Sequence, residues 1–131
     1  TSSGFSKFQN YSQRLAMTDP NTLADFIAYG AENFPANRNM LIFWDHGAGP
    51  VYGYGVDENF DNDTMTFQEM SAAMEASPFS SKNKLDIVGF DACLMASLEM
   101  ADLFSDYAYY MVASQEVEPG MGWDYSFLKK L

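Results

Sequence analysis

Apolar and polar positions along this chain follow periods that predict helices and strands in turn. Asp19 can cap a helix, Pro20 suits a first helical turn, and apolar residues then recur every three to four positions to about residue 33. The next apolar segment, Met40 to Trp44, is a short unbroken run, which predicts a strand buried on both faces. The pattern therefore begins with a helix that leads into a strand of a parallel sheet.

The same alternation continues along the rest of the chain. Thr66 and Glu69 have the spacing of a capping box, which predicts a helix that ends before Pro78. The other expected elements are a buried strand at 85–90, a helix that Cys93 opens and that runs to about 107, a strand at 109–114 and a helix starting near 123, with loops at 1–18 and 51–63. Alternating helices and strands imply right-handed crossovers, so we expect the α/β class, with a mostly parallel sheet and helices on both faces.

Length, charge and composition narrow the function classes. The 131 residues suit one domain, and 47% apolar residues are enough for a core. The formal charge of −11 repels phosphate backbones, which argues against a nucleic-acid partner, and no GxGxxG or GxxxxGK[ST] loop is present to hold a nucleotide. No run of about 18 apolar residues predicts a membrane span. The single cysteine excludes an internal disulfide.

The one histidine and the one cysteine each follow a predicted buried strand. His46 comes two residues after the first strand, and Cys93 comes three residues after the second. Sites in open α/β sheets collect at the carboxyl ends of strands, so neighbouring strands would bring both side chains together. An imidazole favours the thiolate that attacks an amide and later protonates the leaving amine. The pair predicts a cysteine endopeptidase, although each residue taken alone is more often a buried small hydrophobe or a surface group.

Two features next to this pair would assist acyl transfer. A helix that begins at Cys93 would lower the pKa of its thiol through the partial positive charge at the helix N-terminus. Gly47 lets the backbone approach a substrate, and its N–H together with that of Cys93 would hold the developing oxyanion.

Two segments around these residues resemble the histidine and cysteine motifs of the clostripain family, the C11 peptidases of the caspase-like clan. They are Trp-Asp-His-Gly-Ala-Gly at 44–49 and Phe-Asp-Ala-Cys-Leu-Met at 90–95. Weaker similarity extends to the segments at 22–26, 55–57, 113–116 and 119–123. The resemblance covers residues 19 to 125 and implies a caspase-like fold.

The family resemblance assigns roles to individual residues. It implies that His46 is the base, that Cys93 is the nucleophile and that Gly47 lies beside the oxyanion. The family cleaves after arginine or lysine, and Asp91 matches an acid in the pocket for that basic side chain, where a carboxylate pairs with a guanidinium. Asp124 is the candidate for a second pocket acid. Glu116 and Glu118 are its alternatives.

The resemblance also implies that this chain is part of a larger assembly. Residues 1–131 match part of a single caspase-like peptidase domain, with a loop or edge segment at 1–18 and the catalytic core at 19–131. The family's preceding strands are not found before Asp19, so we expect missing segments of the same peptidase or a complementary chain as a partner. Protein or peptide substrates with basic residues are the other partners. Secretion, or a periplasmic or cell-surface location, follows from the family alone.

Alternative interpretations stay open at this point. The chain can be a caspase-like binding or scaffolding module that does not turn over substrate, or a peptidase that prefers another residue before the scissile bond. No cofactor is expected. Calcium activates some clostripain relatives, and Asp57, Asn59, Asp61 and Asp63 alternate like a calcium loop. Asn62, however, stands where that loop has glycine, and we favour a solvated acidic loop.

Overall fold

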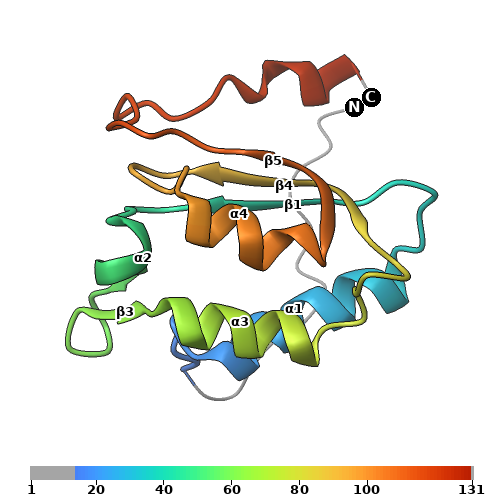
Figure 1. Cartoon of the computed structure of the whole chain (residues 1–131), viewed down its shortest axis with the longest axis horizontal. Helices are drawn as coiled ribbons and strands as arrows, with labels where there is room; N and C mark the ends of the chain where they lie inside the picture. The colour runs from blue at the N-terminus through green and yellow to red at the C-terminus, as the bar shows by residue number, and fades with distance from the viewer. Residues whose placement is uncertain (1–13, 131) are drawn as a thin grey trace.

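The computed structural model describes residues 14–130 and has the predicted alternation of helices and strands (Figure 1). Residues 1–13 and 131 lie outside the described part, so most of the expected loop at 1–18 does too. The elements are α1 (Pro20–Asn33), β1 (Met40–Trp44), α2 (Gly49–Tyr52), β2 (Tyr54–Asp57), β3 (Asp63–Met65), α3 (Phe67–Ala76), β4 (Leu85–Asp91), α4 (Leu98–Ser105), β5 (Ala108–Val112) and the 3-10 helix η1 (Tyr125–Lys130).

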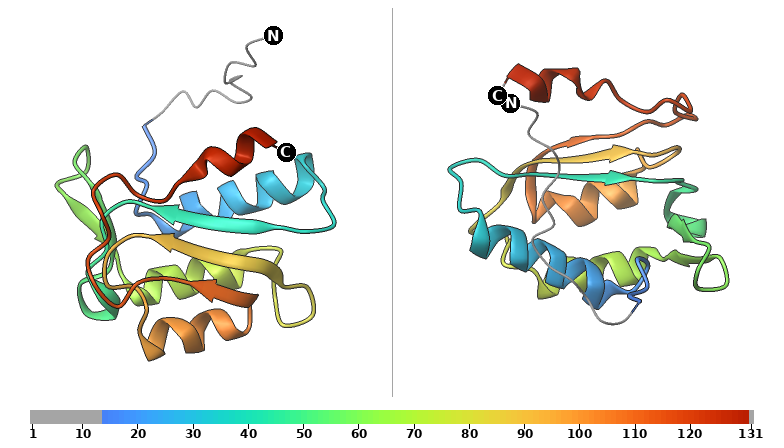
Figure 2. Two further views of the ribbon diagram at one scale, coloured as in Figure 1. Left: turned by 90° about the horizontal axis from the view of Figure 1, so that it is seen from above. Right: turned by 180° about the vertical axis from the view of Figure 1, so that it is seen from behind.

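Although β1 is buried on one face only, and not on both as expected, the main sheet is parallel as predicted. Its order is β1-β4-β5, with both pairs parallel, and Figure 2 shows β4 between its two neighbours. The register of β1 and β4 places Trp44 opposite Asp91, so the two strands end at the same level. The chains that follow these strands therefore leave the sheet side by side.

Three helices cover one face of this sheet. Figure 1 shows α1, α3 and α4 on that face, whereas the segment that contains η1 crosses the other. The core lies between the sheet and the helices, where the Phe43 and Phe90 rings stack at 4.8 Å and Phe104 of α4 meets Phe90 edge to face at 5.4 Å. The α/β class with a mostly parallel sheet is confirmed.

Two helix starts follow the caps expected from the sequence. The Asp19 carboxylate accepts a hydrogen bond from the N–H of Asn21 at the start of α1. Thr66 and Glu69 form the predicted capping box at the start of α3, with both reciprocal hydrogen bonds present. These local signals are satisfied by neighbours in sequence, which is why they could be predicted.

Two local predictions are wrong. The segment 51–63 is not a continuous loop, because β2 and β3 pair antiparallel there as a hairpin. The helix expected to open at Cys93 begins only at Leu98, where the Ser97 side chain caps it. The N–H of Leu94 instead donates to Glu116, and that of Ala96 donates to Ser114. Leu94 also has φ of 62°, outside the right-handed helical region, so the helix cannot begin at Cys93.

The sheet face opposite the three helices exposes apolar side chains. Met40 and Trp44 of β1 are 50% and 72% exposed, and Tyr110 and Val112 of β5 are 71% and 47% exposed. Within residues 14–130, β1 pairs with β4 alone, so its outer edge has no partner strand. No helix in this part of the chain has the length and apolar character needed to cross a membrane.

Candidate active site

The ends of β1 and β4 form one wall of a cavity of about 500 Å³. His46 lies two residues beyond Trp44, and Cys93 lies two residues beyond Asp91, the partner of Trp44 in the register. Both residues therefore lie just beyond the carboxyl ends of neighbouring strands, as expected from the sequence. The cavity is lined by Trp44, Asp45, His46, Asp91, Ala92, Cys93, Glu118, Pro119, Gly120 and Gly122.

Backbone contacts fix the loop that carries His46. Its N–H donates to the Asp45 carboxylate, and its carbonyl accepts the N–H of Gly55 at 2.8 Å. The side chain is exposed, and no residue of the described part hydrogen-bonds to the imidazole. The ring thus has both nitrogens available, and no third residue between 14 and 130 orients it.

Gly47 joins the histidine loop to the cysteine loop. A Cβ atom at this position would lie 2.2 Å from the carbonyl oxygen of Cys93 and 3.1 Å from the Cβ of Ala92. Any side chain would therefore push the two loops apart. The sequence suggested glycine here for the approach of a substrate, and the structure adds contact between the two loops as a second reason.

Cys93 lies in a turn, and its thiol is half-buried. Leu94 continues the turn with φ of 62°, which costs a side-chain-bearing residue some strain. Because α4 starts at Leu98, its N-terminus does not act on the thiol as expected. Instead, the backbone N–H of Glu118 donates a hydrogen bond of 3.2 Å to Sγ.

Two backbone N–H groups near the thiol have no hydrogen-bond partner among the described residues. They belong to Gly47 and Cys93. Gly47 faces Tyr54 in an isolated antiparallel bridge, and the hydrogen bonds of that bridge use His46 and Ala48 instead. Both donors predicted for an oxyanion are therefore unoccupied.

Asp91 is a buried acid at the floor of the cavity, with 3% of its surface exposed. Its Oδ2 accepts two hydrogen bonds, from the Trp123 N–H at 2.9 Å and from the Tyr125 hydroxyl at 2.8 Å. Burial, followed by the hydrogen bond and charge of Asp91, raises the pKa of Tyr125 to about 12. Tyr125 thus keeps its proton at neutral pH and remains a donor.

Of the other candidate pocket acids, the structure places only one at the cavity. Glu118 lines the cavity, whereas Asp124 and Glu116 do not. Asp124 is exposed and accepts from the N–H of Ser126 at 2.8 Å and from its hydroxyl at 3.0 Å, the contacts that lower its pKa. Its carboxylate holds the start of η1 and does not face the cavity. The role assigned to Asp124 gains no support from this geometry.

Sequence reasoning missed Asp45, which lines the cavity, and Tyr125, which binds a residue of the lining. The position of Asp45 next to His46 was the only feature of the sequence that could have indicated it as a cavity residue. Tyr125 contacts Asp91 across 34 positions of sequence. Nothing in the local pattern around Tyr125 indicates that contact.

The acidic hairpin predicted as a weak calcium candidate uses its carboxylates for other contacts. Asp57 is buried and accepts from the N–H groups of Met17 and Asn59, while Asp63 accepts from the Thr18 hydroxyl. These bonds tie the residues before α1 to the hairpin. Among the described residues, no group of three or more His, Cys, Asp or Glu side chains is placed to hold a metal ion. Calcium binding stays the weaker of the two interpretations of this segment, and it is untested.

Comparisons with known proteins show which proteins this chain resembles. Clostripain from Hathewaya histolytica is 30% identical over 127 residues, which cover 83% of this chain and 23% of that protein. A secreted C11 cysteine protease from Bacteroides thetaiotaomicron, solved with an irreversible peptide inhibitor, matches with a TM-score of 0.71 and 25% identity, over 80% of this chain and 30% of that one. An inactive zymogen C11 protease from Parabacteroides distasonis shares the fold, with a TM-score of 0.67, 24% identity and coverage of 88% and 31%.

This chain spans only about a quarter to a third of the relatives it matches. The family model for the clostripain family, in contrast, matches residues 3–131, nearly the whole sequence. That match includes both motifs that meet at the cavity. The chain therefore belongs to the clostripain family of C11 peptidases.

Proposed function

We propose that this chain carries the catalytic dyad of a cysteine endopeptidase, with Cys93 as the nucleophile and His46 as the base. The observation that supports this most is the backbone contact of Gly47 with Cys93, which holds the two loops against each other at one cavity. Cys93 is half-buried and His46 is exposed, so a peptide can reach both residues from solvent.

The proposed reaction follows the usual order of thiol acyl transfer. The imidazole of His46 takes the thiol proton, and Sγ of Cys93 forms a bond to the scissile carbonyl carbon. As the carbon–nitrogen bond breaks, the same imidazole gives its proton to the leaving amine. Water then hydrolyses the thioester and frees the thiol. The unoccupied N–H groups of Gly47 and Cys93 would stabilise the oxyanion in both steps.

Cleavage after arginine or lysine is the specificity that we propose. Asp91 is a buried carboxylate in the wall of the same cavity, and Glu118 adds a second acid there. A buried carboxylate that can still accept hydrogen bonds favours a cationic side chain as its partner. The net charge of −11 would draw basic peptides toward this surface.

Active-site labelling tests the dyad on the natural full-length protein. An arginyl chloromethylketone should alkylate Cys93 and abolish peptidase activity, and Cys93→Ala should remove both effects. His46→Ala should slow labelling by at least about a hundredfold, because the thiol loses its base. The exposed Ser105→Ala variant is the control and should label like the wild type. Labelling that persists in Cys93→Ala would contradict the proposal.

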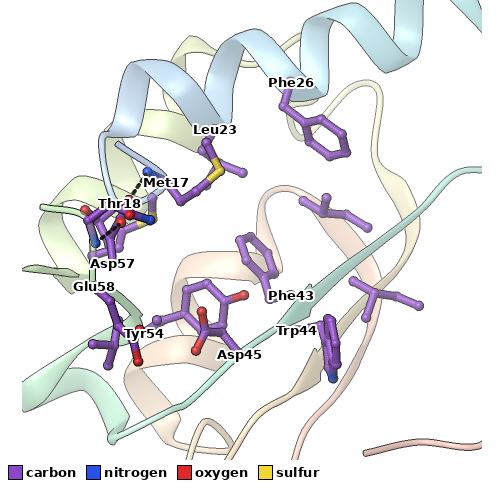
Figure 3. Close-up of a pocket in the computed structure, with 16 residues that line it drawn as sticks. Met17, Thr18, Leu23, Phe26, Phe43, Trp44, Asp45, Tyr54, Asp57 and Glu58 are labelled. Carbon is purple, nitrogen blue, oxygen red and sulfur yellow. Dashed lines mark hydrogen bonds between the residues drawn. The ribbon is translucent and has the colours of Figure 1, made fainter. Parts of the chain in front are cut away.

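We further propose that other segments of the peptidase complete the fold at the outer edge of β1, which has no partner strand among residues 14–130. A second cavity of about 470 Å³ follows that strand, and Figure 3 shows side chains from α1, β1 and β2 around it. Phe26 and Trp44 on this rim are 62% and 72% exposed. A paired strand would cover both the apolar side chains and the open backbone edge.

Two measurements test this part of the proposal. Hydrogen exchange of the β1 backbone N–H groups that point away from β4 should be slow in the full-length protein and fast in residues 1–131 alone. Equal exchange in the two would count against a covering segment. The Bacteroides relative is described as secreted, and we propose export for this protein as well, which fractionation of the producing cells can test.

A further inference from the structure

The two carboxylate oxygens of Asp91 differ in the number of hydrogen bonds that they accept. Both donors, the Trp123 N–H and the Tyr125 hydroxyl, fall on Oδ2, at 2.9 and 2.8 Å. No described residue donates to Oδ1. Every fully buried side-chain oxygen of the described residues has a partner, so Oδ1, which has none there, keeps some contact with solvent. Asp91 lines the cavity, where that contact is available. Asp91 therefore offers the cavity a single unoccupied oxygen.

We infer that Tyr125 is a positioning residue that limits Asp91 to a one-oxygen contact with a basic side chain. The inference rests on the proposed function, in which Asp91 binds that side chain. A guanidinium gains most from a carboxylate by placing two parallel N–H groups on two oxygens, whereas an ammonium acts as a point charge. With Oδ2 occupied, arginine loses this advantage. The enzyme then accepts lysine about as well as arginine.

The loop that carries Tyr125 is held against the sheet by two glycines. A Cβ atom on Gly89 would lie 2.9 Å from the Trp123 ring, so the absence of a side chain in β4 makes room for the indole. A Cβ atom on Gly122 would lie 2.7 Å from Oδ2 of Asp91, and Gly122 has φ of 65°. These contacts fix the Trp123 N–H and the Tyr125 hydroxyl on the same oxygen.

The Tyr125→Phe substitution tests the inference in the full-length protein. It removes one of the two donors and keeps the ring, so Oδ2 retains the Trp123 N–H but gains one free acceptor position for a two-oxygen contact. Matched fluorogenic peptides with arginine or lysine before the scissile bond should show an arginine-to-lysine ratio of kcat/KM that rises about tenfold, the size of one added charge-assisted hydrogen bond. The change should fall on KM for arginine. Tyr109→Phe, at a 68% exposed position outside the cavity, is the control and should keep the wild-type ratio.

A second measurement needs no variant. A peptide with Nω-methylarginine keeps the positive charge but blocks the two-oxygen contact. The wild-type enzyme should cleave it with a kcat/KM within about twofold of the arginine peptide, because one N–H is enough for Oδ1. The Tyr125→Phe variant should cleave it about tenfold less well than arginine.

The possible results separate the inference from the proposed function. An equal loss of activity toward both peptides in Tyr125→Phe, with the ratio unchanged, would overturn the inference and leave cleavage after basic residues intact. A wild type that prefers arginine strongly and rejects methylarginine would overturn it as well. Cleavage of a norleucine peptide as fast as the lysine peptide would instead reject the basic specificity itself, and the inference with it.

Discussion

Gly47 and the carbonyl of Cys93 are in backbone contact, so close that a Cβ atom on Gly47 would lie 2.2 Å from that oxygen. The loop after β1 and the loop after β4 therefore fit together only while position 47 has no side chain. Because His46 precedes this glycine directly, the same contact sets the distance between the imidazole loop and the thiol loop. The stability of the fold and the proposed catalysis thus depend on one residue.

Gly47→Ala should damage both properties. The added methyl group cannot fit without moving the Cys93 turn, and overpacking of this kind costs about 1–3 kcal/mol in the free energy of unfolding. The same movement separates base from nucleophile and should lower kcat more than it raises KM. Urea unfolding and peptidase kinetics on the full-length protein measure the two effects.

Gly30→Ala is the matched control for that substitution. Gly30 lies inside α1, and a Cβ atom there meets nothing within 4 Å. Alanine should stabilise the helix by about 0.5–1 kcal/mol and leave kcat unchanged. If Gly47→Ala also kept wild-type kcat and stability, the contact between the loops would not control the site.

The strand ends that create this site could be predicted, because they depend on local sequence. The run from Met40 to Trp44 is β1 as expected, and the run that starts at Leu85 is β4, one residue longer than expected. The first run is unbroken and apolar and the second is interrupted by Asp86 and Gly89, a pattern typical of parallel strands. The expected burial on both faces is wrong for β1, because Met40 and Trp44 are 50% and 72% exposed. Polar residues at their carboxyl ends then had to meet at one edge of the sheet.

Contacts between distant segments could not be predicted in the same way. The residues after Cys93 have a helical pattern of apolar positions, yet the backbone N–H groups of Leu94 and Ala96 donate to carbonyls beyond β5. Asp91 was identified as a pocket acid by resemblance, but its bonds to Trp123 and Tyr125 depend on how the last segment crosses the sheet. Hydrophobic periodicity contains no information on either.

Ser97→Ala tests the corrected start of α4. The Ser97 hydroxyl accepts the N–H of Met100, and loss of such a cap costs about 1 kcal/mol. The thiol should be unaffected, because the helix begins five residues after Cys93. We expect a lower unfolding free energy with an unchanged rate of Cys93 alkylation, and Ser105→Ala at the other end of α4 should change neither. A slower alkylation rate would indicate that the helix does act on the thiol.

Glu118→Gln tests the second acid of the cavity. Glu118 lines the cavity beside Cys93, and its loss should raise KM for a lysine peptide about three- to fivefold, the range for a partly exposed ion pair. The increase should shrink at high salt, because salt screens this attraction. Glu116→Gln is the matched control, since Glu116 lies two residues away and outside the cavity lining. Equal KM changes in the two variants would assign the effect to net charge alone.

Stability at high pH should report on the bond between Tyr125 and Asp91. The pKa of Tyr125 is raised from 10.0 to about 12 by burial and by the bond and charge of Asp91. Between these values the unfolded chain releases the phenolic proton while the folded chain keeps it, so the free energy of unfolding falls as the pH rises from 10 to 12. Tyr54 also has a raised pKa and adds to the fall in every variant. Urea unfolding from pH 9 to 12 measures this effect. The free energy of unfolding should decline less steeply with pH in Tyr125→Phe than in the wild type or in the control Tyr109→Phe. Parallel curves for all three proteins would mean that the Tyr125 hydroxyl does not donate to Asp91 in solution.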